Sequence, residues 1–191
     1  MSNYEPTFDW YTVVSGSTTF AQGDLLNNFP IIVPPISLTE ARDKAVGHES
    51  RQQATLNLFN VIVMTQSCDF IKLGDKDQVI LCPRWDYSKL ADKEPKFKGK
   101  GGWKNLINGR FIGAHIINKC DIENYEFDYQ VIDLQRIFSS PLSVVKQVAI
   151  DQGSRVRLLP PYREHLAQAF ARQFMRVGLP MDLPRDFPYH K

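Results

Sequence analysis

The sequence predicts a mainly β protein of the α+β class, with a small barrel or highly curved sheet of about five to seven strands and a C-terminal amphipathic helix. Two nearly continuous apolar runs, 56–64 and 78–82, are typical of strands that are covered on both faces or form the wall of a small barrel. Residues 160–178 carry the boundary signals of a helix. With 191 residues, of which 43% are hydrophobic, the chain fits one domain over residues 1–191.

The first two strands are predicted before the first long polar segment. Residues 10–14 read as a short strand that ends in a Ser-Gly-Ser turn, and residues 25–33 form a second extended stretch. Pro30 lacks a backbone donor, so this second strand is not expected at a central, fully paired position of the sheet. Residues 39–53 are charged and lack apolar periodicity, which predicts an exposed loop.

The middle of the chain supplies most of the predicted sheet. The runs 56–64 and 78–82 are separated by turn-forming residues, and residues 110–117 add another strand. Residues 125–131 alternate between apolar and polar side chains, as a half-exposed strand does, and residues 132–138 are expected to continue it.

The predicted C-terminal helix has prolines at its start, and Gly178 and Pro180 at its end. On a helical wheel, one stripe is apolar and must pack on the sheet: Leu166, Phe170, Phe174 and Val177. A second stripe is cationic and consists of His165, Arg172 and Arg176. That stripe suits a phosphate or an acidic partner surface, and it is equally typical of a solvated helix face.

Composition excludes several classes of protein. The three cysteines, Cys68, Cys82 and Cys120, form no C-x-x-C pair, which argues against a disulfide framework and a structural zinc site. The four histidines have no paired spacing, so no metal is expected, and without a Gly-rich phosphate cradle no cofactor is expected. The start lacks the features of a secretory signal, and no apolar run approaches the ~20 residues that span a bilayer, so we expect a cytoplasmic protein without membrane contact.

A basic segment is the strongest indication of a nucleic-acid partner. The net charge of +2 is too small to indicate one by itself. Residues 89–109, however, mix lysines with glycines and two aromatic residues, which predicts an exposed loop. Cations suit phosphates and aromatic rings suit the bases of a single strand, although such stretches are often only solvated loops. The candidate binding residues here are Lys96, Lys98, Lys100, Trp103 and Lys104.

Five polar or reactive side chains follow the apolar run 56–64 directly: Thr65, Gln66, Ser67, Cys68 and Asp69. A strand end can hold such groups in defined geometry, which would make this segment the lining of a functional hollow. The same residue types are common where a strand ends in an ordinary turn. Both interpretations stay open at this point.

The order of several short motifs resembles the MazF/PemK family of bacterial toxins. These motifs are Gln22-Gly23-Asp24 entering a strand, the strand 61–64 ending in Thr-Gln-Ser, further strands through 79–81 and 131–135, and 154–159 leading into the terminal helix. The resemblance covers most of residues 22–177 and implies an SH3-like curved sheet. It also implies dimerisation and metal-independent cleavage of single-stranded RNA.

The sequence departs from this family where catalysis takes place. Family nucleases have an Arg-Pro pair entering the strand that corresponds to 61–64, and a Thr or Ser leaving the next strand. Phe59-Asn60 stands at the first place and Cys82-Pro83-Arg84 at the second. Loss of one such preorganised donor costs about 2.7–4 kcal/mol of barrier lowering.

Two functions follow from the resemblance and its departures. The first is a binding or regulatory component of a bacterial toxin-related or phage-defence system, which acts on a protein partner or on single-stranded RNA. Its site would be the concave face of the sheet, rimmed by Thr65, Gln66, Asp69, Arg84 and the basic segment. The alternative is a metal-independent endoribonuclease, with Thr65, Ser67, Arg84 and either His115 or Arg136 as its catalytic set. A third arrangement uses Cys68 as a nucleophile with His115 as its base and Asp69 to orient it. Homodimerisation is compatible with each.

Overall fold

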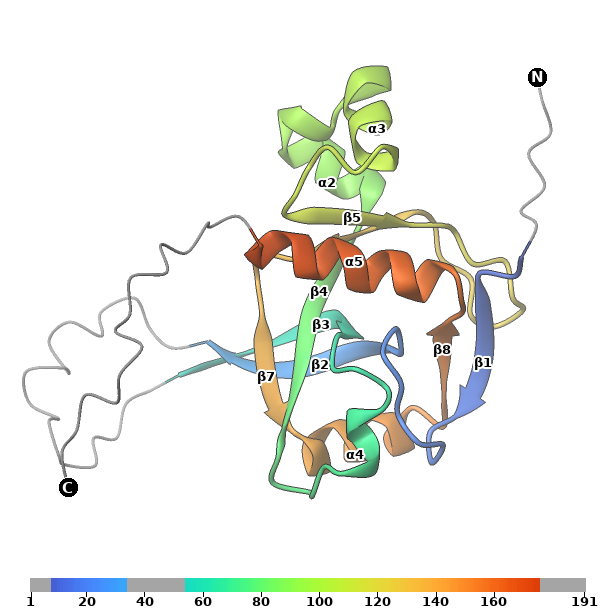
Figure 1. Cartoon of the computed structure of the whole chain (residues 1–191), viewed down its shortest axis with the longest axis vertical. Coiled ribbons are helices and arrows are strands. Elements are labelled where there is room, and N and C mark those ends of the chain that lie inside the picture. Colours follow the sequence, from blue (N-terminus) through green and yellow to red (C-terminus); the bar gives the residue numbers. More distant parts are fainter. Residues whose placement is uncertain (1–7, 34–53, 176–191) are drawn as a thin grey trace, which may run out of the picture.

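The computed structural model describes residues 8–33 and 54–175. In these ranges the chain forms an α+β fold of two antiparallel sheets and four α-helices (Figure 1). The strands are β1 (Tyr11–Ser15), β2 (Leu25–Val33), β3 (Thr55–Val63), β4 (Gln78–Asp86), β5 (Ala114–Ile117), β6 (Gln130–Asp133), β7 (Phe138–Pro141) and β8 (Ser154–Leu158). The helices are α2 (Tyr87–Lys93), α3 (Gly99–Ile107), α4 (Leu142–Asp151) and α5 (Tyr162–Phe174), with short 3-10 turns at Asp69–Ile71 and Pro95–Phe97.

The larger sheet is open and does not close into a barrel, so the prediction of a small barrel or highly curved sheet is confirmed only in part. Its order is β2-β3-β4-β6-β5, and β1 pairs with β8 in a separate two-stranded sheet. The long strand β4 pairs with β7 through its first half and with β6 through its second half. Strand β4 thus has one neighbour, β7, along its first residues and another, β6, along its last. The α+β class is confirmed.

The predicted strands are confirmed to different degrees. The bounds of β2 are those predicted, and β3 and β4 contain the two apolar runs. The segment 110–117 enters the sheet only at Ala114. The segment 125–131 pairs regularly only from Gln130 onward, and the chain turns at 134–137, so residues 132–138 do not continue a single strand.

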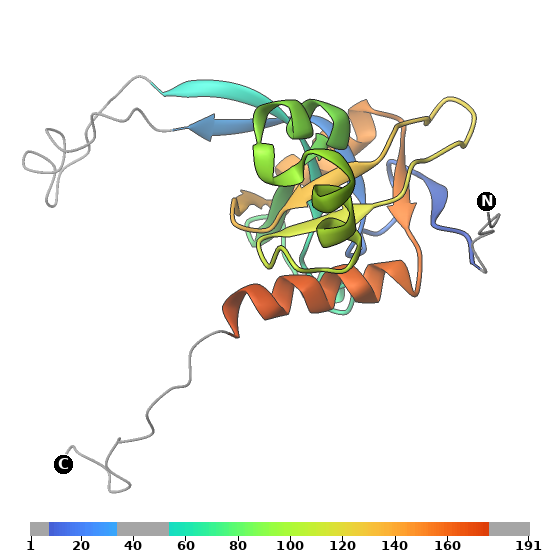
Figure 2. The same cartoon turned by 90° about the horizontal axis from the view of Figure 1, so that it is seen from above.

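Strand β2 lies at an edge of the larger sheet, as Pro30 predicts. The register between β2 and β3 shifts between Leu26 and Phe29, and Asn28 there has a φ of 50°. Beyond this irregularity the two strands project from the body as a ribbon (Figure 2). One face of the ribbon exposes the large apolar side chains Ile32, Leu56 and Leu58.

The prediction that residues 89–109 form an exposed loop is wrong, because this segment is largely helical. Phe97 and Leu106 are buried and pack with Val131 of the sheet. A Cβ on Gly102 would lie 2.2 Å from the backbone carbon of Phe97, so this glycine lets α3 approach the preceding turn closely. Tertiary packing therefore overrides the low helix propensity of the three glycines in α3. The predicted loop 39–53 lies outside the described residues.

The C-terminal helix is present as α5. Leu166 is fully buried, and Phe170 packs partly against the same core. Phe174 is 58% exposed, so the predicted apolar stripe covers the sheet only along the first turns of the helix. Val177 and Arg176 lie outside the described residues. Helix α4 was not predicted.

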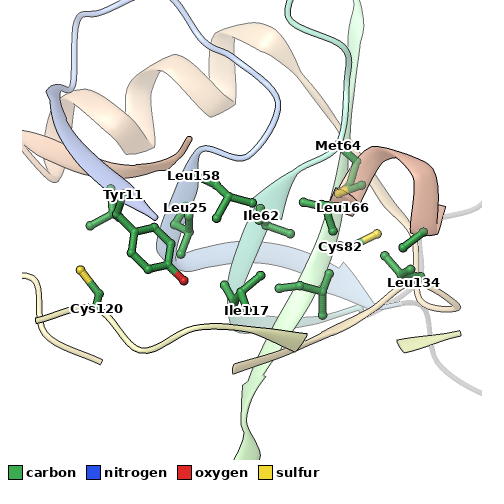
Figure 3. Close-up of a cluster of buried hydrophobic side chains, with 13 residues drawn as sticks. Tyr11, Leu25, Ile62, Met64, Cys82, Ile117, Cys120, Leu134, Leu158 and Leu166 are labelled. Carbon is green, nitrogen blue, oxygen red and sulfur yellow. The ribbon is translucent and has the colours of Figure 1, made fainter. Parts of the chain in front are cut away.

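One hydrophobic cluster joins the two sheets and α5 (Figure 3). It contains Leu25 and Ile62 from the larger sheet, Leu158 from the smaller sheet and Leu166 from α5. Tyr11 lies among them, and its hydroxyl donates a 2.6 Å hydrogen bond to the carbonyl of Asn118. Burial raises the pKa of Tyr11 far above its ordinary value.

A buried ion cluster forms the second link between the sheets. The Asp24 carboxylate is fully buried and accepts hydrogen bonds from Arg155 Nε at 2.8 Å and from Arg157 Nη2 at 2.9 Å. Arg155 also donates to four backbone carbonyls between residues 15 and 19. The backbone of Asp24 accepts a 2.8 Å bond from Val63 of β3. The Gly-Asp motif is therefore a structural junction in this chain.

We expect the substitution Asp24→Asn to lower the free energy of unfolding by about 3–5 kcal/mol, because it leaves two guanidinium groups with no counter-charge in a buried position. Urea denaturation followed by circular dichroism measures this loss. Asp75→Asn is the matched control, because Asp75 pairs with Lys146 at the surface, and its loss should change stability by less than about 1 kcal/mol. Equal effects of the two substitutions would contradict a structural role for the buried cluster.

Candidate functional site

The five polar residues after β3 form a turn. Thr65 Oγ1 accepts a 2.8 Å hydrogen bond from the backbone nitrogen of Ile80, and Ser67 Oγ accepts a 3.1 Å bond from that of Gln22. Asp69 begins a short 3-10 turn. Both hydroxyls thus satisfy neighbouring backbone donors, which is the role that such residues have at strand ends.

These five residues line neither of the two cavities described below. Gln66, Cys68 and Asp69 are exposed, and the Cys68 thiol lies 3.8 Å from Gln66 Oε1 and 3.7 Å from Asp69 Oδ1. His115 lies in a groove that Cys68 does not line. The structure therefore does not bring Cys68 and His115 into one cavity, and the catalytic roles of the turn residues stay a prediction.

Arg84 is held inside the protein. Its guanidinium donates to the side-chain oxygens of Asn27 and Gln130, and it lies 5.6 Å from the ring centre of Phe127. Among the described residues its Nε finds no hydrogen-bond partner. Burial lowers the pKa of Arg84 to about 10. Like the turn residues, Arg84 lines neither cavity.

The largest hollow described is a groove of about 1040 Å³ between α3, β5 and α5, which we call the α3–α5 groove. In Figure 1, β5 runs between α5 and the pair of helices α2 and α3. The floor comes from β5 and the residues that follow it, and the two helices form the walls. The groove is open to solvent along its length, and it collects aromatic and cationic side chains from segments that are far apart in the sequence.

Four aromatic side chains line the α3–α5 groove. Trp103 of α3 makes an edge contact with Tyr129, the ring centres being 4.9 Å apart. Trp10, just before β1, stacks on Tyr162 at the start of α5, with ring centres 3.5 Å apart and planes 8° from parallel. These contacts hold the rings in fixed positions while part of each ring remains accessible from the groove.

Basic side chains also line the groove. His115, His165, Arg172 and Lys119 line it, and among the described residues the one carboxylate in its lining, Asp121, pairs with Lys119 at 3.0 Å. Burial, together with the neighbouring His165 and Arg172, lowers the pKa of His115 to about 4. His115 is therefore neutral at physiological pH.

The predicted binding residues are distributed over two sides of the α2–α3 region. Trp103 lines the α3–α5 groove, whereas Lys96 lines a smaller cavity of about 330 Å³ that also contains Trp85 and Arg110. Lys98, Lys100 and Lys104 are exposed beside or on α3. Sequence reasoning did not identify Trp10 or Tyr162 as site residues, since neither has basic residues around it in a pattern like that around Trp103.

Among residues 8–33 and 54–175, no three histidine, cysteine or acidic side chains lie close enough together to hold a metal ion. Within the same ranges, every helix is too short or too polar to cross a membrane. No protein-family model matches this chain, and no curated protein matches it. The candidate site is therefore identified from the arrangement of the side chains that line the α3–α5 groove.

The low pKa of His115 predicts a pH-dependent loss of stability. The folded protein binds this proton only near pH 4, whereas an unfolded chain binds it near 6.5. Stability is therefore complete above about pH 6.5 and falls as the pH drops toward 4, by at most about 1.4 kcal/mol per pH unit. Urea denaturation across this range should show a smaller loss for His115→Gln than for the wild type. Identical pH profiles would contradict the burial of this imidazole.

Proposed function

We propose that the protein binds single-stranded RNA in the α3–α5 groove and acts as a binding or regulatory component. The observation that carries this proposal is that four aromatic side chains, two histidines, Lys119 and Arg172 gather along one groove. Bases stack on aromatic faces without regard to sequence, and cations attract the phosphates that connect them. The groove has a volume of about 1040 Å³ and is partly open to solvent.

The flanks of the groove support the same partner. Lys98, Lys100 and Lys104 are exposed beside Trp103 on α3, and none of them has an ion pair with a described residue. A strand whose base stacks on Trp103 would carry its neighbouring phosphates toward these ammonium groups. Helical structure in this segment fixes the lysines relative to the tryptophan, which a mobile loop would not do.

The resemblance to MazF/PemK toxins is part of the proposal. The Gly-Asp junction before β2, the apolar strands β3 and β4, and the strand β8 that leads into α5 occur in the order that suggested an SH3-like curved sheet. A chain of this type without the family's catalytic arginine would act in a bacterial toxin-related or phage-defence system by binding. Because Arg84 is buried and bonded to Asn27 and Gln130, we expect bound RNA to remain intact.

Replacing Trp103 by alanine should weaken the binding of a fluorescein-labelled single-stranded RNA by about 1–3 kcal/mol, the usual value of one stacked base. Fluorescence anisotropy in EDTA at low salt measures the affinity, and a denaturing gel of the same samples shows whether the RNA is cut. Trp85→Ala is the matched control, because Trp85 lines the smaller cavity.

The salt dependence provides a second readout. The triple variant Lys98→Ala, Lys100→Ala and Lys104→Ala should reduce the slope of log affinity against log salt by about 0.7 for each phosphate contact removed. The control triple removes Lys72, Lys76 and Lys146, which are exposed near the opposite end of β4. Absence of RNA binding, or equal losses in test and control variants, would refute the proposal. Specific cuts abolished by Arg84→Ala would favour the endoribonuclease instead.

A further inference from the structure

We propose that His115, His165 and Arg172 form a phosphate-binding subsite in the α3–α5 groove, which takes one phosphate group of the bound strand. This inference rests on the proposed function for the identity of the strand, but the subsite is defined by its own three side chains. They come from two elements that the fold brings together, β5 for His115 and α5 for His165 and Arg172.

The polar atoms of these three side chains have no partner among the described residues. Among the described residues, none of the three makes a hydrogen bond or an ion pair through its side chain; His165 only contacts the ring of Tyr162 edge-on. By contrast, the buried Arg155 and the half-buried Arg157 bind Asp24 and backbone carbonyls. A guanidinium and two imidazoles that converge without a counter-ion have unused donors that suit phosphate oxygens.

The immediate surroundings leave the cluster without a carboxylate of its own. From α5 the groups that face His115 are His165 and Arg172; from the segment after β5 they are Lys119 and Asp121. Asp121 is engaged by Lys119 at 3.0 Å and 3.2 Å. The phenols of Tyr129 and Tyr162 complete the polar lining, and α3 contributes only uncharged groups there.

The guanidinium of Arg172 lies against the end of α3 at Gly109. A Cβ at this position would lie 3.4 Å from Arg172 Nη2, which is an ordinary van der Waals contact. Gly109 follows α3 with a φ of +62°, a backbone conformation that favours glycine. The arginine is thereby placed where the wall formed by α3 meets the wall formed by α5.

A phosphate in this subsite would couple RNA binding to proton uptake. Burial, His165 and Arg172 disfavour the protonated form of His115 in the empty groove. A phosphate between the three groups would place negative charge beside His115 and favour its protonated form. If the bound phosphate restores the ordinary pKa of His115, affinity should increase about tenfold between about pH 7.5 and about pH 5.5.

The test measures binding of single-stranded RNA labelled at its 3′ end, with either a 5′-phosphate or a 5′-hydroxyl, at both pH values and constant ionic strength. We expect His115→Gln to remove most of the increase at low pH. Arg172→Gln should weaken binding at both pH values. Arg163→Gln is the charge-matched control, because Arg163 lies on the same helix, pairs with Glu164 and does not line the groove.

Titration with inorganic phosphate, followed by nuclear magnetic resonance of the histidine ring protons, separates this inference from the proposed function. Shifts of the His115 and His165 signals that Arg172→Gln abolishes would support the subsite even if RNA does not bind. RNA binding without any change in these signals, or with the same pH dependence in wild type and His115→Gln, would overturn it. An Arg172-dependent preference for 5′-phosphorylated RNA identifies a terminal phosphate, and equal affinities identify a backbone phosphate.

Discussion

The buried carboxylate of Asp24 is the constraint on which the rest of the structure depends. Its side chain binds two arginines of β8, while its backbone is bonded to β3 of the larger sheet. Charges this deeply buried are tolerated only when each one is paired and hydrogen-bonded. The pairing therefore fixes how the small sheet is oriented on the large one, and β8 leads directly into α5. The ion cluster therefore helps to position α5, which forms one wall of the α3–α5 groove.

The other wall of the groove depends on packing. Helix α3 is short and contains three glycines, so it has little intrinsic tendency to form. It is stabilised because Leu106 and the preceding Phe97 are buried against the sheet, and because Gly102 permits a close approach to the turn before it. The groove thus lies between α5, which follows the ion-paired strand β8 and packs on the hydrophobic core, and α3, which is held by a small apolar cluster. The edge strand β5 forms its floor.

The sequence alone predicted the parts of this fold in which local pattern and tertiary environment agree. Residues 25–33 have the same bounds in prediction and structure, and Pro30 correctly indicated an edge strand. The prediction failed for α3, because glycine and lysine spacing is typical of loops and says nothing of the Phe97 contact. It also failed for the sheet as a whole, since apolar runs do not reveal that β4 exchanges one partner for another halfway along its length.

For the candidate site, Trp103 was identified from its basic neighbours. His115, His165 and Arg172 were each noticed separately, and only the three-dimensional structure brings them together.

The edge strand β2 has a consequence for the behaviour of the protein at high concentration. Beyond Phe29 it forms, with β3, a ribbon that exposes Ile32, Leu56 and Leu58, which is the kind of apolar edge that recruits strands from other molecules into aggregates. Pro30 removes one backbone donor from this strand, and the irregularity at Asn28 bends it. Both features shorten the straight stretch available for intermolecular pairing. The proline that lowers the regularity of the sheet thus helps to keep separate copies of the chain from polymerising.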